Sequence, residues 1–390
     1  MTRPVVVTGV GAVTPLGVGA DVLHARLVSG ETGLADGDGR CDAFDRDTPL
    51  TRREQRRHAR FAQLALVAAD EALRQAGWTD GGLPCAPEDV LCAVGTGLGG
   101  APDHAGAEPS PLTVPLMMPN SAAAGLSMRY GLGGESFAPC GACAAGAQAI
   151  GFALRSLRRG DAAAAVVGGA EAASVPLVRD SFGFAGALSP TGRCLPFDER
   201  RDGFVMGEGA GVLVLETLEG ATARGATVLG RVLGYGATSD AHHLTAPPPD
   251  GRPAAECVRR ALADARVAPA DLCYINAHGT GTRLNDEAEI RSLRQTLGDD
   301  LAGIPVSSTK AATGHLFGAG GAVEAVITLA ALREGKAPPT TGTEQPDPAL
   351  GPLDHVLAPR ALAPRSQGLI GLSDSFGFGG HNAALVLGAP

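Results

Sequence analysis

The sequence predicts an α/β fold in which helices cover a largely buried sheet. Apolar runs of strand length alternate along the 390 residues with Ala/Leu-rich stretches of helical periodicity, which is typical of α/β domains. The strand-like runs are nearly unbroken, as expected for strands buried on both faces. With 56 glycines and only 4% aromatic residues, helices and strands are expected to pack at close range.

Four strands and four helices stand out along the chain. The strands are expected in VVVTGVGAV near the start, AAAAVVGGAE around Val167, LCYINAHGT around Ile275 and GLIGLSDS around Leu372. The helices are expected over residues 59–77, 143–159, 253–266 and 320–332. Pro/Gly-rich stretches after Gly100, from Thr245 and over 338–352 predict surface loops. Residues 5–17 and 231–240 both read as a strand running into a Gly/Thr loop, which by itself is poor evidence for duplication.

Charge and composition exclude several classes of protein. A net charge of −9 argues against a nucleic-acid binder or a membrane-surface protein. No apolar run reaches the length of a membrane span and the N-terminus lacks a signal-peptide pattern. The eight cysteines are scattered rather than grouped in a framework, which fits reduced thiols, so we expect a cytoplasmic protein.

Cys143 is the first candidate for chemistry. It lies where the predicted helix over 143–159 begins, and Gly160 supplies a stop signal. The helix dipole at this position favours a thiolate and would lower the thiol pKa. Gly141 and Ala142 leave room for a sharp turn from strand to helix, as at nucleophile elbows. The alternative is a small cysteine buried in the core.

Cys140 and Cys143 also form a C-x-x-C pair. That spacing occurs in redox motifs and in half of a zinc site. A zinc site needs two further ligands at short spacing, and none follows nearby. We therefore interpret Cys140 as a packing residue and expect no metal.

Two histidines and a glycine-rich turn are further candidates. His278 follows the strand in NAHGTGTRLND, and His315 precedes the helix in SSTKAATGHLFGAGG, so both could face a cavity. Lys310 and Glu324 could pair beside His315, although a surface ion pair explains them equally well. The GFGG segment over 377–380 could donate backbone N–H groups to an oxyanion hole, or be only a hairpin turn.

Taken together, these segments resemble the elongating β-ketoacyl-acyl carrier protein synthases of fatty acid and polyketide synthesis. The resemblance runs end to end and includes VVVTGVGAVTPLG, GTGLGG, GACAAG, VVGGAEA, FDERRDGFVMGEGAGVLVLE, SDAHHLTAPPPDG, NAHGTGTRLND, SSTKAATGHLFGAGGAVEA and SFGFGGHN. It implies a thiolase-like fold of two repeated βαβαβαββ halves in five α/β/α/β/α layers. The halves are expected over 1–227, with the nucleophile, and 228–390, with the histidines.

The resemblance also assigns roles by position. It implies that Cys143 is the nucleophile and that His278 and His315 are the catalytic histidines, with Lys310 supporting the second and Glu324 near it. It implies that Phe378 is a gating residue whose N–H joins that of Cys143 in the oxyanion hole. Further positions are implied as follows: Thr280 and Thr282 hold phosphopantetheine, Leu98, Ala142 and Phe182 line the acyl pocket, and Met117 and Met118 reach it across a dimer.

The activity implied is a decarboxylative condensation. An acyl group on Cys143 would be joined to malonate that arrives on the phosphopantetheine of an acyl carrier protein, with no other cofactor. The implied assembly is a homodimer, or a heterodimer with a chain-length-factor subunit. The pathway, fatty acid or polyketide, stays open.

The chain departs from the family pattern at three places. The loop after Gly100 is shorter than is common, Gly186 stands where a carrier-docking arginine is frequent, and His381 replaces a frequent threonine. Three relatives of the family are alternatives. A thiolase would need a second cysteine near the C-terminus, whereas the last one is Cys273; a priming synthase would carry a Cys–His–Asn set; and a chain-length factor would typically lack the active cysteine.

The segment TRREQRRHAR carries the densest positive charge of the chain. If it enters the helix that follows, Arg53 and Arg57 lie one turn apart, as do Arg56 and Arg60. The resemblance implies that Arg53 and Arg57 dock the acidic carrier protein. The alternative is a solvated helix start.

Overall fold

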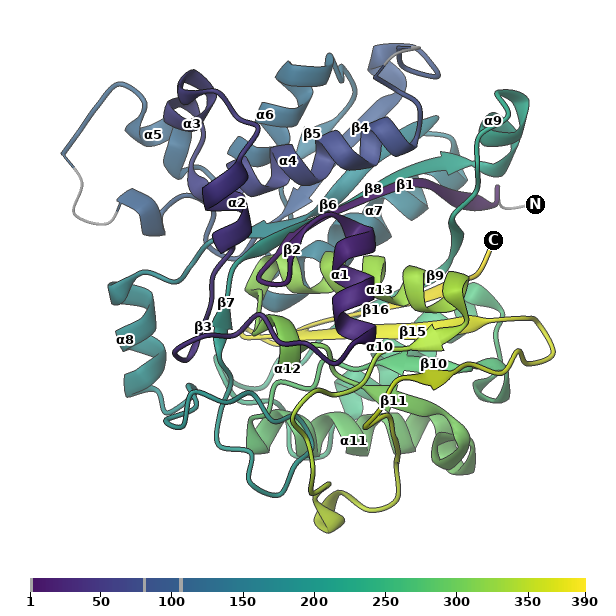
Figure 1. Cartoon of the computed structure of the whole chain (residues 1–390). Helices are drawn as coiled ribbons and strands as arrows, with labels where there is room; N and C mark the ends of the chain where they lie inside the picture. The colour runs from purple at the N-terminus through teal and green to yellow at the C-terminus, as the bar shows by residue number, and fades with distance from the viewer. Residues whose placement is uncertain (1–2, 80–81, 105–107) are drawn as a thin grey trace.

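The computed structural model describes residues 3–79, 82–104 and 108–390. Its helices are α1 (Ala20–Val28), α2 (Asp42–Asp47), α3 (Arg52–Arg57), α4 (Arg60–Gln75), α5 (Thr113–Met117), α6 (Ser121–Tyr130), α7 (Ala145–Arg159), α8 (Pro176–Phe184), α9 (Leu218–Ala223), α10 (Arg252–Ala265), α11 (Arg283–Leu297), α12 (Lys310–Thr313) and α13 (Gly320–Glu334). Short 3₁₀ turns include η3 (Ala142–Ala144) and η6 (Phe317–Ala319). Figure 1 shows how these elements are arranged.

Most strands of the described residues join one sheet. They are β1 (Val5–Thr14), β2 (Gly17–Val18), β4 (Val90–Gly95), β5 (Ser136–Phe137), β6 (Ala164–Glu171), β8 (Gly209–Thr217), β9 (Gly230–Ser239), β10 (Tyr274–Asn276), β11 (Pro305–Ser307), β13 (Asp354–His355), β15 (Ile370–Gly377) and β16 (His381–Gly388). Two small sheets pair β3 (Asp38–Gly39) with β7 (Met206–Gly207) and β12 (Lys336–Ala337) with β14 (Arg360–Ala361).

The strand order of the large sheet is two-fold symmetric. It runs β13-β11-β10-β15-β16-β9-β1-β8-β6-β4-β5, with β2 beside β1. The two middle strands, β1 and β9, are antiparallel and meet at Val6–Arg231. Outward from them, each side has two antiparallel pairings followed by two parallel ones, and on the β16 side β13 adds a third parallel pairing with β11. Each side follows the order strand, helix, strand, helix, strand, helix, strand, strand, which confirms the predicted repeat.

The similarity noted between residues 5–17 and 231–240 therefore falls on the two central strands, β1 and β9, which start the two halves. The predicted division between residues 227 and 228 falls between α9 and β9. That domain boundary stays a prediction.

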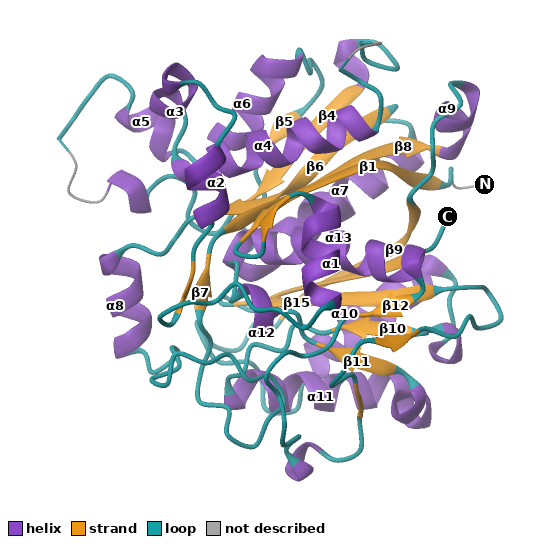
Figure 2. Ribbon diagram, viewed as in Figure 1, coloured by secondary structure: helices purple, strands orange, loops and turns teal. Residues whose placement is uncertain are grey.

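Helices form three layers around the two halves of the sheet (Figure 2). Helices α4 and α6 pack on the N-terminal half, α10 and α11 on the C-terminal half, and α7 and α13 lie between the halves. Every residue of α13 from Gly320 to Leu332 is buried, because a helix in the middle layer is covered on all sides. A Cβ on Gly146 of α7 would lie 2.8 Å from the backbone nitrogen of Ala322 in α13. Glycine at this position thus allows the two central helices to approach closely.

The expected strands and helices are present, with one instructive difference. The α-helix expected from residue 143 begins at Ala145, and Cys143 lies in the preceding 3₁₀ turn η3. Ala142 has φ +47°, a left-handed conformation that is rare outside glycine. The chain bends here more sharply than a regular helix start would allow. Of the loop predicted after Gly100, residues 105–107 lie outside the described part.

Candidate active site

A cavity of about 710 Å³ lies where segments of the two halves meet. Cys143 comes from the start of α7, His278 from the loop after β10 and His315 from the loop before α13. Nine of the residues singled out in the sequence line this one cavity: Leu98, Ala142, Cys143, Phe182, His278, Thr280, Thr282, His315 and Phe378.

The Cys143 thiol is held between a ring nitrogen and a backbone amide. Its Sγ lies 3.0 Å from Nε2 of His315. The backbone N–H of Phe378 donates a hydrogen bond to it from the turn between β15 and β16. A Cβ on Gly377 would lie 2.9 Å from the Cys143 nitrogen, so only glycine lets this turn come so close. The GFGG segment is thus both the hairpin turn and a source of N–H groups at the thiol.

The pKa of the Cys143 thiol differs from the sequence-based expectation. We expected the helix start to lower the pKa of Cys143, but burial raises it to about 12. The charge of Lys310 and the Phe378 N–H lower the pKa of the thiol without offsetting burial. The expectation was wrong because a position at a helix start does not by itself ensure contact with solvent, and here the thiol lies inside a lined cavity.

His278 and His315 form an edge-to-face pair whose ring centroids are 5.5 Å apart. Burial and the nearby charge of Lys310 hold the pKa of both well below the usual histidine value. Both rings are therefore neutral at pH 7, and each carries a single N–H. Phe317 stacks on the His315 ring at 4.9 Å and Phe204 meets its edge at 5.3 Å, which fixes the orientation of this imidazole.

Lys310 and Glu324 form a buried ion pair behind the histidines. Nζ of Lys310 donates to Oε1 of Glu324, and the two residues are 1% and 4% exposed. The alternative of a surface ion pair is wrong. Neither residue lines the cavity, so their effect on it is electrostatic. Sequence could not show this, because an ion pair reads the same whether buried or exposed.

The loop from His278 to Thr282 is held from behind by three buried carboxyl groups. The N–H of His278 donates to Asp374 at 2.8 Å, that of Gly279 to Glu289 at 2.8 Å and that of Gly281 to Asp286 at 3.2 Å. The result is a rigid loop whose Thr280 and Thr282 hydroxyls lie 2.9 Å apart at the cavity wall.

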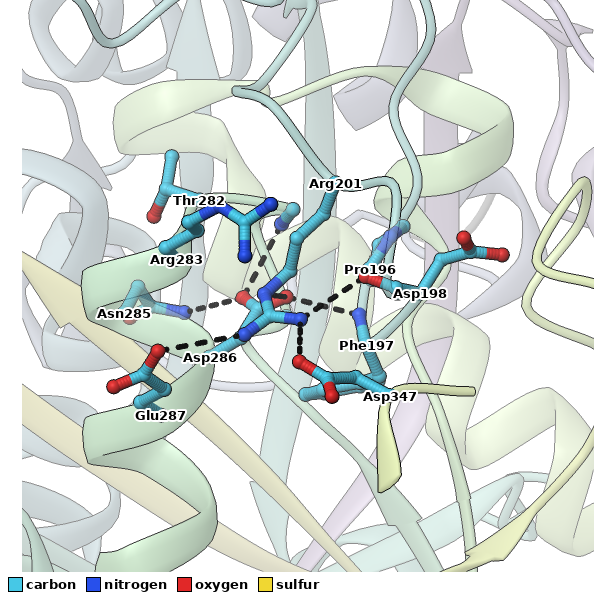
Figure 3. Close-up of polar contacts among 12 residues, drawn as sticks. Pro196, Phe197, Asp198, Arg201, Thr282, Arg283, Asn285, Asp286, Glu287 and Asp347 are labelled. Carbon is cyan, nitrogen blue, oxygen red and sulfur yellow. Dashed lines mark hydrogen bonds and ion pairs between the residues drawn. The ribbon is translucent and has the colours of Figure 1, made fainter. Parts of the chain in front are cut away.

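Arg201 supplies positive charge to this carboxyl cluster (Figure 3). The arginine is fully buried and pairs with Asp347 at 2.6 Å, while its Nε lies 3.8 Å from Asp286. Burial raises the pKa of Asp286 to about 6 and Arg201 opposes the rise. Arg201 and the three carboxyl groups were missed in the sequence, where DERRDGF and NDEAE resemble ordinary polar helix and loop segments.

Glu171, at the end of β6, is another functional candidate that the sequence did not reveal. Its carboxylate accepts hydrogen bonds from the N–H groups of Gly97, Leu98 and Gly318, at 2.5, 3.2 and 3.1 Å. Burial raises its pKa to about 6. The side chain ties the GTGLGG loop, which carries Leu98, to the turn after His315.

Some predicted residues lie away from the cavity. Met117 and Met118 are 37% and 42% exposed at the end of α5, and neither lines the cavity of the single chain. Cys140 is not a packing residue as predicted: it is exposed and borders the cavity.

Arg53 and Arg57 are exposed on α3, as predicted for a docking surface. The expectation for Arg56 and Arg60 was wrong. The chain is extended at His58 and Ala59, so α3 and α4 are separate helices. Arg60 instead pairs with Glu208 and Asp45, each at 2.6 Å.

The described residues show neither a metal site nor a membrane-spanning helix. No group of three or more His, Cys, Asp or Glu side chains there could hold a metal ion. None of the helices in the described ranges is both long and apolar enough to cross a membrane.

Comparison with known proteins identifies the family. The model of "Beta-ketoacyl synthase, N-terminal domain" matches residues 2–221 and that of "Beta-ketoacyl synthase, C-terminal domain" residues 229–344. Curated relatives named 3-oxoacyl-[acyl-carrier-protein] synthase 2 are 41% identical in Synechocystis (98% of this chain, 97% of the relative) and 40% in Rhizobium meliloti (99% and 98%).

Solved structures agree with this assignment. The ishigamide ketosynthase/chain length factor superposes with a TM-score of 0.89 at 32% identity over the whole of both chains. A β-ketoacyl synthase from Burkholderia phymatum gives 0.89 at 31%, also over both whole chains. These likenesses confirm the thiolase-like ketosynthase fold, and the chain belongs to the β-ketoacyl synthase family.

Proposed function

We propose that this chain is a β-ketoacyl-acyl carrier protein synthase that lengthens an acyl chain by decarboxylative condensation. The observation that carries the proposal is the grouping of four residues in one cavity. The Cys143 thiol lies 3.0 Å from His315, receives the Phe378 N–H, and is accompanied by a second neutral histidine, His278. The name of the curated relatives, 3-oxoacyl-[acyl-carrier-protein] synthase 2, supports it.

In the first half-reaction the Cys143 sulfur attacks an acyl thioester. A carbon–sulfur bond forms to Cys143, the carrier thiol leaves, and the proton of Cys143 is transferred to it overall. The oxyanion of the tetrahedral intermediate accepts hydrogen bonds from the N–H groups of Phe378 and Cys143. This covalent step divides one difficult condensation into two easier ones.

In the second half-reaction a malonyl group enters the same cavity. The Thr280 and Thr282 hydroxyls hold its phosphopantetheine arm. As carbon dioxide leaves, N–H donors from neutral His278 and His315 stabilise the enolate that forms. Its carbanion attacks the acyl carbonyl, the Cys143–acyl bond breaks, and the product is a β-ketoacyl group two carbons longer. The steps require neither a metal nor a redox cofactor.

The geometry disfavours the two alternatives. In a non-catalytic chain-length-factor subunit, a thiol held between a histidine and a backbone amide is not expected. In a thiolase the second cysteine would come from near the C-terminus, but Cys273 is 2% exposed and does not line the cavity. Cys140 does line it, yet it belongs to the same turn as the nucleophile.

The partner is an acyl carrier protein, and the assembly is a dimer through the β5 edge of the sheet. One solved relative is titled as a type II polyketide synthase carrier protein in complex with its ketosynthase. Strand β5 is the last strand at one edge of the sheet. The ring centroid of its residue Phe137 lies 5.8 Å from that of Phe152, and Phe152 is 45% exposed. Such an exposed strand edge with apolar neighbours needs covering. Light scattering should give twice the chain mass; a monomer would contradict this.

A panel of carrier proteins tests the function. Purified protein is incubated with acyl carrier proteins of increasing chain length and with malonyl carrier protein, and products are weighed. A product two carbons longer than its primer is expected, and the preferred length also indicates the pathway. Hydrolysis alone, or no use of malonyl carrier protein with any primer, would overturn the proposal.

A further inference from the structure

The most exposed apolar side chains of the described residues are gathered around the cavity mouth. Six large apolar side chains are more than 60% exposed. Two of them belong to α5 and α6. The other four, which we call the apolar rim, belong to three segments that line the cavity: Leu177 (64%), Phe184 (93%), Leu244 (80%) and Leu284 (65%).

Helix α8 supplies two residues of the apolar rim. Leu177 and Phe184 are seven residues apart, two helical turns, and so share one face of α8. On the inner side of the helix, Phe182 lies 6.0 Å from Phe378. The residues directly after Phe184, from Ala185 to Ala187, line the cavity. Figure 1 shows α8 standing out at the left edge of the molecule.

The other two segments meet α8 around the Phe378 turn. The carbonyl of Leu244 accepts a hydrogen bond from the N–H of Gly379 at 2.7 Å, and its neighbours His243 and Thr245 line the cavity. Leu284 lines the cavity itself, two residues beyond Thr282. Each of the three segments that carry the apolar rim therefore also lines the cavity of Cys143.

At Gly186 and Phe184, the cavity mouth offers an apolar side chain instead of a charged one. Gly186, where the family pattern places a carrier-docking arginine, is exposed, lines the cavity and has no side chain. Two residues before it stands the 93% exposed ring of Phe184. A largely exposed aromatic ring beside a cavity mouth is typical of a binding anchor rather than of a stabilised monomer surface.

We propose that the carrier protein docks on the apolar rim, with Phe184 as its anchor, through apolar side chains at the base of its phosphopantetheine arm. This rests on the proposed function, because the arm must pass the apolar rim to bring its thioester to Cys143. The contact takes the place of an ion pair at Gly186. The arginines of α3 add long-range steering, which salt screens, whereas an apolar contact is insensitive to moderate salt.

Phe184→Ser tests the proposal, with Leu218→Ser as the matched control. Leu218 is 39% exposed on α9, which lies on the opposite side of the molecule in Figure 1. We expect Phe184→Ser to raise the KM for malonyl carrier protein about tenfold, the effect of losing a modest anchor, and by the same factor at low and high salt. Self-acylation from a small soluble thioester, and every property of Leu218→Ser, should stay unchanged.

Affinity for the carrier protein, measured by calorimetry without turnover, separates the outcomes. An unchanged KM and affinity in Phe184→Ser would overturn the proposal. Loss of the dimer with unchanged carrier affinity would show that the apolar rim belongs to a second copy of the chain instead. If wild type binds the carrier protein but never condenses, and Phe184→Ser binds about tenfold more weakly, docking stands and the proposed reaction fails.

Discussion

At the scale of single residues, the site combines a protonated thiol with groups that favour its ionised form. Burial raises the Cys143 pKa, whereas the charge of Lys310 and the Phe378 N–H lower it. We assign acyl transfer to Cys143 with Lys310 and Phe378, and enolate stabilisation to His278 and His315, whose neutral rings can each donate one N–H.

This division of labour predicts distinct losses. His278→Ala and His315→Ala should each still accept an acyl group on Cys143, because the groups that favour the thiolate remain. Each should lose malonyl decarboxylation at least about 100-fold, as when one donor to a developing oxyanion is removed. Intact-mass measurement of the acyl-enzyme and carbon dioxide release separate the two steps. A histidine variant that condenses at near wild-type rate would remove that residue from the mechanism.

Lys310→Met should change the pH dependence in a stated direction. Burial, with the charge of Lys310 as a second cause, holds the pKa of both histidines well below 6.5, so wild type keeps both rings neutral as the pH falls through 6.5. Without that charge their pKa values rise, and the acid limb of the condensation profile should move to higher pH.

Lys310→Met should also raise the pKa of Cys143, because the charge of Lys310 lowers it. Acylation at pH 7 should therefore slow as well. Lys336→Met, at an exposed lysine, is the control, and circular dichroism checks folding. If both variants keep the wild-type profile, the Lys310 charge does not act on the histidines.

At the scale of elements, the site depends on the close contact of α7 with α13. Cys143 lies in the turn directly before α7, and His315 lies in the loop that leads through η6 into α13. The separation of the two helices is set by Gly146 against Ala322 and by Gly321, where a Cβ would lie 2.9 Å from Ala147. Small residues here fix the 3.0 Å approach of Nε2 to Sγ.

Gly146→Ala should therefore lower stability and misplace the site together. The added methyl would lie within 3.0 Å of backbone and side chain atoms of α13, and such overpacking costs about 1–3 kcal/mol. Urea unfolding should show this loss, and acylation should slow. Gly183→Ala, in α8 with open space at its Cβ, is the helical control and should be neutral or slightly stabilising. Equal stability of the two variants would refute the role of the contact.

Helix α3 offers a second test at this scale. A capping box between Thr51 and Glu54 fixes its start, and Arg53 and Arg57 lie one turn apart on its exposed surface. Arg53→Glu with Arg57→Glu should raise the KM for malonyl carrier protein and flatten its salt dependence. Arg52→Glu with Arg56→Glu, on another face of the same helix, is the control. If carrier-dependent turnover survives the first pair unchanged, α3 is only a solvated helix.

At the scale of the whole molecule, much of the fold could be predicted from sequence. Unbroken apolar strands and Ala/Leu-rich helices predicted buried layers, and the segments around Cys143, His278 and His315 carry the motifs that meet in one cavity. Long-range electrostatics could not be predicted. Arg60 was expected one helical turn from Arg56, but it pairs with Glu208, which is far along the chain.

The burial of individual side chains also could not be predicted from the sequence. The helix start predicted a lowered Cys143 pKa, but the surrounding cavity reverses the direction. Cys140 was expected in the core and instead faces the cavity, because the sharp turn at Ala142 reorients residues only three positions apart. Asp286 and Glu289 belong to α11 and Asp374 to β15, and only the fold brings these three carboxyl groups to the loop from His278 to Thr282.

The central claim is that Cys143 carries the acyl group between two half-reactions in one cavity. The most direct test loads the protein with an acyl carrier protein alone, maps the acylated peptide, and then adds malonyl carrier protein. The account predicts acylation at Cys143, with loss of that acyl group matched one to one by carbon dioxide and β-ketoacyl product. Acylation at another residue, or an acyl group on Cys143 that persists while malonyl carrier protein is consumed, would contradict it.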